Sequence, residues 1–305
     1  MIDIRLRVFQ SVANNLSFTK ASKELFKCQP AISRHIQELE SEFNTRLFNR
    51  KSTSIELTDA GKLLLKHVNI ILSDYEKLAF EMNALNEKFE GSLTIGASTT
   101  IFQYVLPQIL AEFKKKFPDI KISTMCGNTD AIERAVLNHD VDIGMVEGID
   151  TKTTLKYTPF MNDELVAFVK KGTELSNHNV ITIKELKELP LILKDEGTVT
   201  RKLIEMQLEA LGYSLDDFNV EMCFSDAESV KCFVENSESV GILSDKTIRS
   251  EISRKSLKKL KIKGLEFNRK FSFVERNQPE EGGPDQRFKS FTSSFFDSIN
   301  LLKSK

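Results

Sequence analysis

No proline interrupts the sequence between positions 58 and 89, and the single glycine of this stretch, Gly61, lies near its start. Such a segment can form one helix of roughly thirty residues. Apolar side chains recur along it with alternating spacings of four and three residues: Leu64, Val68, Ile71, Tyr75, Leu78, Met82 and Leu85. A seam of this kind is typical of helices that pair between two chains, so we expect a dimer; a long amphipathic helix packed on its own domain is the alternative.

Charge is distributed unevenly on the two sides of this predicted helix. Residues 1–66 carry eleven Lys and Arg but only seven Asp and Glu, whereas the whole chain has a net charge of −1. The first fifth is therefore basic, at +4, and the remainder is acidic, at −5. A basic module of this size indicates binding to a polyanion such as DNA.

Three short helices are predicted before position 45. The first covers about 4–14, the second follows Thr19 as its expected N-cap, and the third begins at Gln29 and buries an apolar stripe. This is the spacing of a helix-turn-helix. The outward face of the third helix carries side chains that can address base edges: Gln29, Ser33, Arg34 and Gln37. A solvated face without partners is the alternative.

Five short motifs carry a resemblance to a known family: Phe18-Thr19-Lys20-Ala21, Gln29-Pro30-Ala31-Ile32-Ser33, Leu39-Glu40, Leu47-Phe48-Asn49-Arg50 and Leu57-Thr58-Asp59-Ala60-Gly61. In this order and spacing they resemble the amino-terminal domain of LysR-type transcriptional regulators. The resemblance implies a winged helix-turn-helix at 1–58 and a linker dimerisation helix at 59–89. The resemblance also implies which residues contact DNA. The major groove is contacted by Gln29, Pro30, Ser33 and Arg34, and the phosphate backbone by Arg50 and Lys51 of the wing.

Beyond position 90 the apolar pattern alternates between short strands and helices. A first set has strands near 93–97, 120–122 and 141–146, with a helix at 101–117, and a second set has strands between 165 and 243. This repetition predicts an α/β fold in two lobes. By the family resemblance, residues 90–305 form an effector domain that resembles type 2 periplasmic binding proteins. Lobe I is then expected at 90–162 and 268–305, and lobe II at 163–267.

Hydroxyls and amides follow several of the predicted strands, where open sheets bind ligands and helices present free amides. The candidates for effector binding are Ser98, Thr99, Thr100, Asn128, Thr129, Thr198 and Thr200. Together they predict a site for a small anion that needs no buried Lys or Arg. Each of them can instead simply cap its helix. Glu147, Ser225 and Asp226 also follow strands. They are candidates for contacts at the rim of the site or with an amine group of the ligand.

Within the family, the loop sequences look most like the cysteine-metabolism regulator branch. The resulting expectation is a transcriptional regulator that binds an interrupted inverted repeat in double-stranded DNA, forms a dimer and a tetramer, and responds to a small-molecule effector. RNA polymerase is a further possible partner. The chain is expected in the cytoplasm, with no membrane span, cofactor or metal and with Cys28, Cys126, Cys223 and Cys232 as reduced thiols. An enzyme and a solute-binding transport protein are the rival classes, and no nucleophile with an evident base or phosphate-loop motif favours catalysis.

Overall fold

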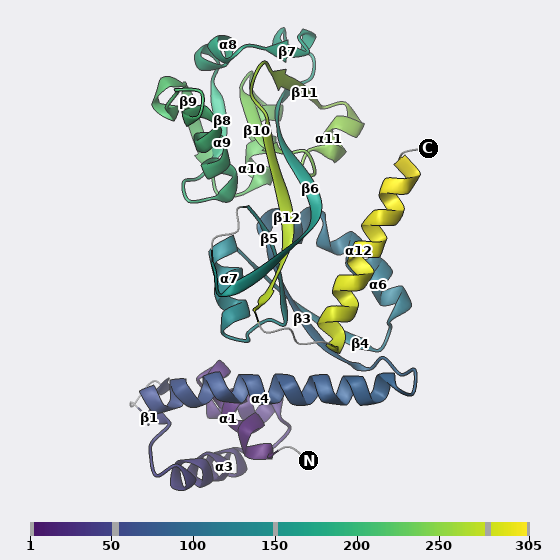
Figure 1. The fold of residues 1–305 in the computed structure, drawn as a ribbon. Helices are drawn as coiled ribbons and strands as arrows, with labels where there is room; N and C mark the ends of the chain where they lie inside the picture. The colour runs from purple at the N-terminus through teal and green to yellow at the C-terminus, as the bar shows by residue number, and fades with distance from the viewer. Residues whose placement is uncertain (1–2, 51–54, 149–151, 278–281, 304–305) are drawn as a thin grey trace.

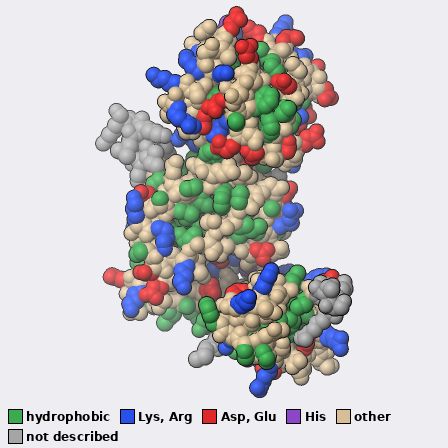
Figure 2. Space-filling model, turned by 180° about the vertical axis from the view of Figure 1, so that it is seen from behind, with side chains coloured by type: hydrophobic (Ala, Val, Ile, Leu, Met, Phe, Trp, Pro, Cys, Tyr) green, Lys and Arg blue, Asp and Glu red, His purple; other side chains and the backbone are tan. Residues whose placement is uncertain are grey.

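The computed structural model describes residues 3–50, 55–148, 152–277 and 282–303. They form three tiers, which Figure 1 shows from the amino-terminal helices below to the second α/β lobe above. Figure 2 shows the same tiers from behind, with Lys, Arg, Asp and Glu spread over all three and apolar side chains gathered on the middle tier.

The lowest tier begins with the three predicted helices. They are α1 (Ile4–Asn15), α2 (Phe18–Glu24) and α3 (Gln29–Glu42), followed by an antiparallel hairpin of β1 (Phe48–Arg50) and β2 (Ile55–Leu57). Ser17 caps α2 by accepting from the Lys20 N–H, so the prediction of Thr19 as the cap is wrong, because the helix starts one residue before Thr19. Cys28 precedes α3 without a side-chain cap hydrogen bond, as expected for a thiol.

Helix α4 (Asp59–Ala84) runs across this tier and supports it. Thr58 caps its start, and Gly61 is required there, because a Cβ at this position would stand 2.2 Å from the carbonyl oxygen of Leu47. The helix ends five residues before the predicted end at position 89, since the chain turns at Glu87, which has a φ of +58°. Leu85 is therefore the C-cap and lies outside the helical seam.

The middle tier, lobe I, is built on parallel strands with helices on both sides. Its elements are β3 (Gly91–Ser98), α5 (Thr99–Tyr104), α6 (Leu106–Lys116), β4 (Ile120–Gly127), α7 (Thr129–Leu137) and β5 (Ile143–Glu147). The single helix predicted at 101–117 is divided, because Val105 leaves helical geometry with a φ of −119° and Pro107 lies in the first turn of α6. Phe113 of α6 and Phe288 are fully buried between helices and sheet.

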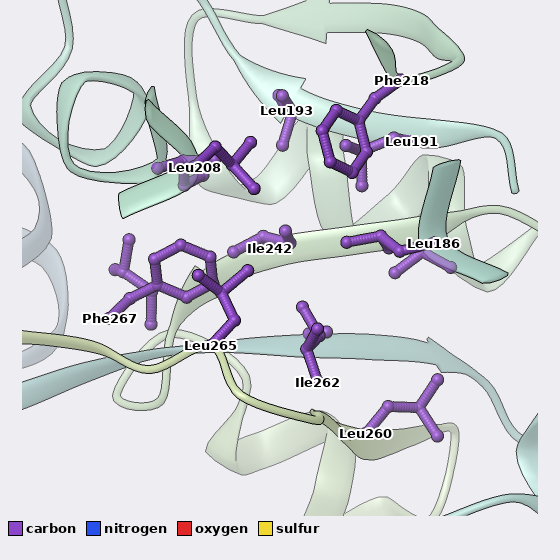
Figure 3. Close-up of a cluster of buried hydrophobic side chains, with 14 of the residues drawn as sticks. Leu186, Leu191, Leu193, Leu208, Phe218, Ile242, Leu260, Ile262, Leu265 and Phe267 are labelled. Carbon is purple, nitrogen blue, oxygen red and sulfur yellow. The ribbon is translucent and has the colours of Figure 1, made fainter. Parts of the chain in front are cut away.

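The upper tier, lobe II, repeats the arrangement. Its elements are β7 (Val180–Ile181), α8 (Ile183–Glu188), β8 (Leu191–Lys194), α9 (Val199–Glu209), β9 (Val220–Phe224), α10 (Ala227–Glu235), β10 (Val240–Ser244), α11 (Arg249–Arg254) and β11 (Leu257–Ile262). Figure 3 shows its core, where Leu193 and Ile242 of neighbouring strands meet Leu208 of α9 and Phe267. Strand β9 at the edge of the sheet and helices α9, α10 and α11 follow the predicted pattern, whereas β7, α8 and β11 were not predicted.

Two long strands join the lobes. Strand β6 (Leu155–Lys170) and strand β12 (Phe267–Arg276) pair antiparallel along the length of β12, from Phe267 opposite Leu165 to Arg276 opposite Leu155. They lie at the centre of one sheet with the order β4-β3-β5-β12-β6-β10-β8-β9, so each lobe contributes one half of it. Helix α12 (Gly283–Lys303) then returns along lobe I, as predicted. The lobes are thus connected by a two-stranded hinge.

Candidate DNA interface and effector cleft

The outward face of α3 carries polar side chains over a buried apolar stripe. Ile32, Ile36 and Leu39 are buried in the core of the lowest tier. On the other side Gln29, Pro30, Arg34 and Gln37 are exposed, and Ser33 is half-buried. The Arg34 guanidinium donates to Glu38 at 2.9 Å, one turn along the helix, and this contact holds the pKa of the Glu38 carboxyl below its usual range. The arrangement leaves a row of donors and acceptors free to meet a groove of DNA.

The wing is described only in part. Arg50 ends β1, but nothing is described of its side chain, and Lys51 lies outside the described residues, so their assignment to phosphate stays a prediction. In the turn before α3, Phe26 is 96% exposed and has a φ of +52°, which is rare for an aromatic residue. The sequence pattern gives no reason to single out this side chain.

The apolar seam of α4 divides into two parts. Val68 is fully buried in the core of the helix-turn-helix, so the prediction that it faces a second chain is wrong; its spacing also matches the groove of its own domain. Leu64 is half-buried against the same core, and its place in the seam stays a prediction. The rest of the helical seam is exposed to solvent, namely Ile71 (45%), Tyr75 (37%), Leu78 (54%) and Met82 (57%), and the C-cap Leu85 is exposed too (79%). An exposed apolar row of this length is typical of an interaction surface.

A cavity of about 620 Å³ lies between the lobes, beside the hinge strands. Five of the seven predicted effector residues line it: Thr99, Asn128, Thr129, Thr198 and Thr200. Ser98 and Thr100 are buried behind this surface and are not among its lining residues, because the first turn of α5 directs only Thr99 toward the gap. The structure therefore brings hydroxyls of both lobes together but excludes two of the predicted ones.

Some of these side chains do cap helices. Asn128 accepts from the Ala131 N–H at 2.9 Å, and Thr198 accepts from the Arg201 N–H at 3.2 Å. Thr129 donates instead to the carbonyl oxygen of Glu147, at 3.1 Å. Capping and cleft lining are thus combined in the same residues, since a capped helix terminus still directs its remaining amides into the cavity.

The floor of the cleft is a buried arginine on the hinge. Arg269 of β12 donates to Asp163 of β6 at 2.7 Å, forms an ion pair with Glu147 and contacts the Thr200 hydroxyl at 3.4 Å. Its Nη2 atom is buried with no hydrogen-bond partner among the described residues. Two carboxylates balance the charge of this guanidinium, while one of its donors is left unused.

Lys194 is a buried cation without such direct compensation. It ends strand β8, is 6% exposed and lines the cleft. No hydrogen bond or ion pair joins its ammonium to another described residue, and the nearby Asp226 carboxylate already accepts from the backbone and hydroxyl of Ser229. An ammonium without a counter-charge favours an anion beside it. The cleft thus contains a Lys and an Arg that the sequence interpretation did not include, while the expectation that an anion can bind without them stays a prediction.

Comparison with known proteins assigns both halves of the chain. Residues 4–62 match the family model "Bacterial regulatory helix-turn-helix protein, lysR family", and residues 86–291 match "LysR substrate binding domain". The chain belongs to the LysR family of transcriptional regulators.

Two LysR relatives illustrate the match along the whole chain. The HTH-type transcriptional regulator CysL of Bacillus subtilis is 29% identical over 298 residues, which is 98% of each protein. A probable RuBisCO transcriptional regulator of Trieres chinensis is 32% identical over 275 residues, covering 88% of this chain and 89% of the relative. The predicted likeness to a cysteine-metabolism branch is thus confirmed as a likeness, at modest identity.

Solved LysR structures share the fold. A full-length OxyR variant of Pseudomonas aeruginosa has a TM-score of 0.74 at 16% identity and covers 96% of this chain and 94% of its own. Full-length CbnR complexed with its target DNA has a TM-score of 0.64 at 20% identity, with 96% and 99% covered. The regulatory domain of Synechocystis CcmR, in complex with 2-PG, has a TM-score of 0.61 at 22% identity, with 67% and 96% covered.

Other features of this LysR chain concern the predictions about membrane spans, metal sites and cysteines. No helix in the described parts of the chain is long and apolar enough to cross a membrane, and no group of three or more His, Cys, Asp or Glu there is placed to hold a metal ion. All four cysteines are free and exposed. Lys194 is the principal site residue that the sequence interpretation missed; its place directly after the buried run 191–193, equivalent to that of Ser98 in lobe I, was the available signal.

Proposed function

We propose that this LysR regulator responds to a small anion held in the cleft between its lobes. The Lys194 side chain, which is 6% exposed, lines the cleft and has no ion-pair partner among the described residues, and this observation carries the proposal. Hydroxyls from both lobes surround the same space, and the free Nη2 donor of Arg269 lies at its floor. An anion that reaches Lys194 gains a charge-assisted hydrogen bond and supplies the counter-charge that this ammonium lacks.

The acidic groups of the cleft limit the ligand to a small anion. Both acidic lining residues belong to lobe I: Glu147 is paired with Arg269, and Asp130 has Lys152 as its partner at 3.5 Å. A large polyanion would come close to both carboxylates and be repelled by them. A sulfate-sized ligand or a short carboxylate can bind near Lys194 and Thr198 without this repulsion. The complex of CcmR with 2-PG supports a small-molecule ligand for a domain of this fold.

Calorimetric titration of the full chain with inorganic sulfate, inorganic phosphate and malonate tests the proposal. We expect one of these anions to bind with a Kd of roughly 10 μM to 1 mM, since a few hydrogen bonds and one ion pair each contribute modestly. Lys194→Gln should weaken that binding about tenfold to hundredfold, the range for losing a charge-assisted hydrogen bond.

Lys202→Gln is the matched control. Lys202 also lines the cleft, but it is exposed, so its removal should change the affinity by less than about threefold. Equal losses in both variants would indicate only general attraction to the basic residues. Unchanged binding in Lys194→Gln would place the ligand elsewhere.

The finer expectations about partners form part of the same proposal. The exposed half of the α4 seam supports a dimer that presents two α3 helices to an interrupted inverted repeat, and the complex of CbnR with its target DNA supports DNA binding by a chain of this fold. A tetramer, contact with RNA polymerase and a cytoplasmic location are proposed on the family alone. No catalytic step and no cofactor are proposed, and selective recovery of genomic fragments by the full chain would identify the operator.

A further inference from the structure

A second cavity, of about 690 Å³, lies on the opposite side of the hinge strands from the effector cleft. The cleft is flanked by α7 and α9, whereas this rear cavity is lined by residues of α5, α6 and α12 of lobe I and of the start of α11 in lobe II. Pro159 and Lys270 line both cavities, so only the crossing strands separate them. Its volume falls in the range of small-molecule sites, which is about 300–1,000 Å³.

The chemistry of the rear cavity differs from that of the cleft. Its apolar surface comes from both crossing strands and neighbouring helices: Tyr104, Val105, Pro107, Pro159, Phe160, Met161 and Phe296. Its cations are Lys246, Arg249 and Lys270, and none of its described lining residues is Asp or Glu. No hydrogen bond or ion pair joins the Lys270 ammonium to another described residue. Arg249 forms an ion pair with Asp245 at 3.2 Å.

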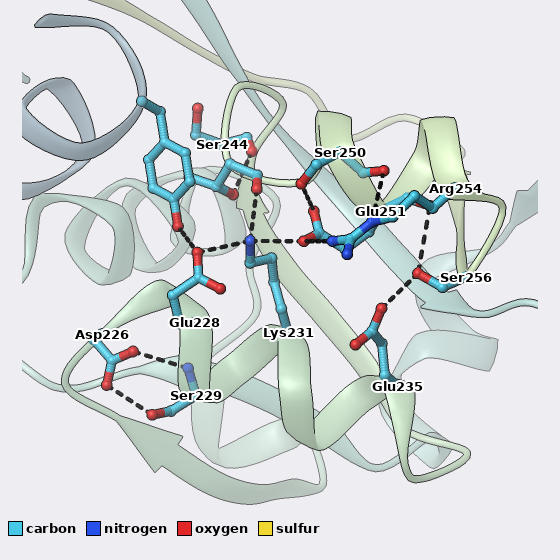
Figure 4. A network of polar contacts seen from close by, with 12 residues as sticks. Asp226, Glu228, Ser229, Lys231, Glu235, Ser244, Ser250, Glu251, Arg254 and Ser256 are labelled. Atoms are coloured by element: carbon cyan, nitrogen blue, oxygen red, sulfur yellow. Dashed lines mark hydrogen bonds and ion pairs between the residues drawn. The ribbon is translucent and has the colours of Figure 1, made fainter. Parts of the chain in front are cut away.

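The wall behind this cavity is fixed by its own polar network. Lys231 of α10 donates to the Thr247 carbonyl oxygen and to Glu251, each at 3.0 Å, and pairs with Glu228 at 2.8 Å (Figure 4). The Tyr104 hydroxyl of lobe I also donates to Glu228, which ties α5 to α10 across the lobes. These groups satisfy one another, so the features of the cavity that remain for a ligand are its aromatic surface and the Lys270 ammonium.

We propose that the rear cavity is a second binding site, for a small organic anion with an aromatic body. Such a ligand would lay its ring against Phe160 and Met161 and direct its anionic group to Lys270 and Arg249. It would contact both lobes behind the hinge. A rotation about β6 and β12 that narrows the effector cleft widens the rear gap, so the rear ligand should oppose closure of the cleft. This last step rests on the proposed function.

Calorimetry of the full chain with 1-naphthalenesulfonate tests the site directly. We expect saturable binding with one ligand per chain and no comparable binding of neutral 1-naphthalenemethanol. Arg249→Gln should weaken the binding about five- to tenfold, and Gln108→Trp, an exposed position on the lobe I side, should fill the cavity and abolish it. Arg254→Gln is the matched control, because Arg254 lies on the same helix outside the cavity.

Each outcome of these titrations decides one step. Equal affinity of the wild type, Arg249→Gln and Gln108→Trp would overturn the site, as would an equal loss in Arg254→Gln. Saturation with 1-naphthalenesulfonate should then lower the affinity for the cleft anion several-fold, and by linkage the cleft anion should lower the affinity for 1-naphthalenesulfonate by the same factor. Binding of both without mutual effect would overturn the coupling. A failure of the cleft anions to bind would overturn the proposed function and leave the direct titration of the rear cavity valid.

Discussion

Arg34 is the residue of α3 best suited to distinguish one base pair from another. Its guanidinium is largely exposed and is held only by Glu38, a surface pair of small energy that DNA can replace. Arg34→Ala should relax sequence preference and cost about 1–3 kcal/mol at a single guanine position. Binding to operator variants, with Lys51→Ala as the phosphate-contact control, measures this, and equal loss of affinity for operator and random DNA would contradict base reading.

Phe26 is held in a conformation that its side chain does not favour. It is 96% exposed and has a φ of +52°, so no burial offsets the strain of the left-handed region. Phe26→Asn should therefore stabilise the fold by about 0.5–1 kcal/mol in thermal unfolding. Phe43→Asn is the control. Phe43 is 50% exposed but has a φ of −87°, so its replacement should give no such gain in stability. A destabilised Phe26→Asn variant would mean that the aromatic ring supports the turn.

At the scale of elements, α4 combines two functions along one seam. Val68 belongs to the core of the helix-turn-helix, whereas Ile71 and Leu78 face solvent. Ile71→Lys and Leu78→Lys should thus dissociate the dimer without unfolding the chain, and Val68→Lys should unfold the lowest tier, because it buries a charge. Sedimentation with circular dichroism distinguishes the two effects.

Leu63→Lys is the control for this helix. Leu63 is 60% exposed but lies outside the four-three series, so its substitution should leave the oligomer intact. An unchanged oligomer in both Ile71→Lys and Leu78→Lys would remove the pairing role from α4.

An element can be predicted from the sequence when its interactions join residues that are close together along the chain. The helices of the lowest tier, the main strands and the place of the cleft follow from apolar periodicity and from the rule that ligands lie at strand ends. Periodicity cannot say which partner covers a face, which is why it assigns Val68 to a second chain. Strand β7, with two residues, is too short to show a pattern, and Lys194 was missed because a charged residue at the end of a strand is normally exposed.

At the scale of the whole molecule, the two-lobed arrangement depends on contacts between distant segments. The partners Phe267 and Leu165 are about one hundred positions apart, and the Arg269–Asp163 pair that fixes the hinge has a similar separation. No local signal predicts such pairings, so the return of the chain to lobe I followed from the family resemblance alone. Strands β6 and β12 belong to both lobes, so any change in the angle between the lobes has to involve them.

The lowest tier is attached to lobe I through a polar contact of α4. The Asn69 side chain accepts from Gln10 at 2.9 Å and donates to the Asn138 carbonyl oxygen at 3.3 Å. The next residue, His139, is half-buried and has a φ of +60°. Burial, followed by repulsion from Arg276, Lys77 and Lys66, lowers the pKa of His139 from 6.5 to about 4. This histidine makes the stability of the junction dependent on pH.

Because the pKa of His139 is lower in the folded state than in the unfolded state, its contribution to stability is complete above pH 6.5 and is lost as the pH falls toward 4. Burial raises the pKa of Asp142 and of Asp285 nearby, so these carboxyls act in the opposite direction on acidification. We expect His139→Asn to reduce the loss of stability between pH 7.5 and pH 5 by about 1 kcal/mol, a value reduced for the partial exposure of the ring. Asparagine tolerates the positive φ, so the variant should fold. Thermal unfolding of both proteins at the two pH values measures this difference, and an equal loss in both would show that His139 titrates normally in the folded chain.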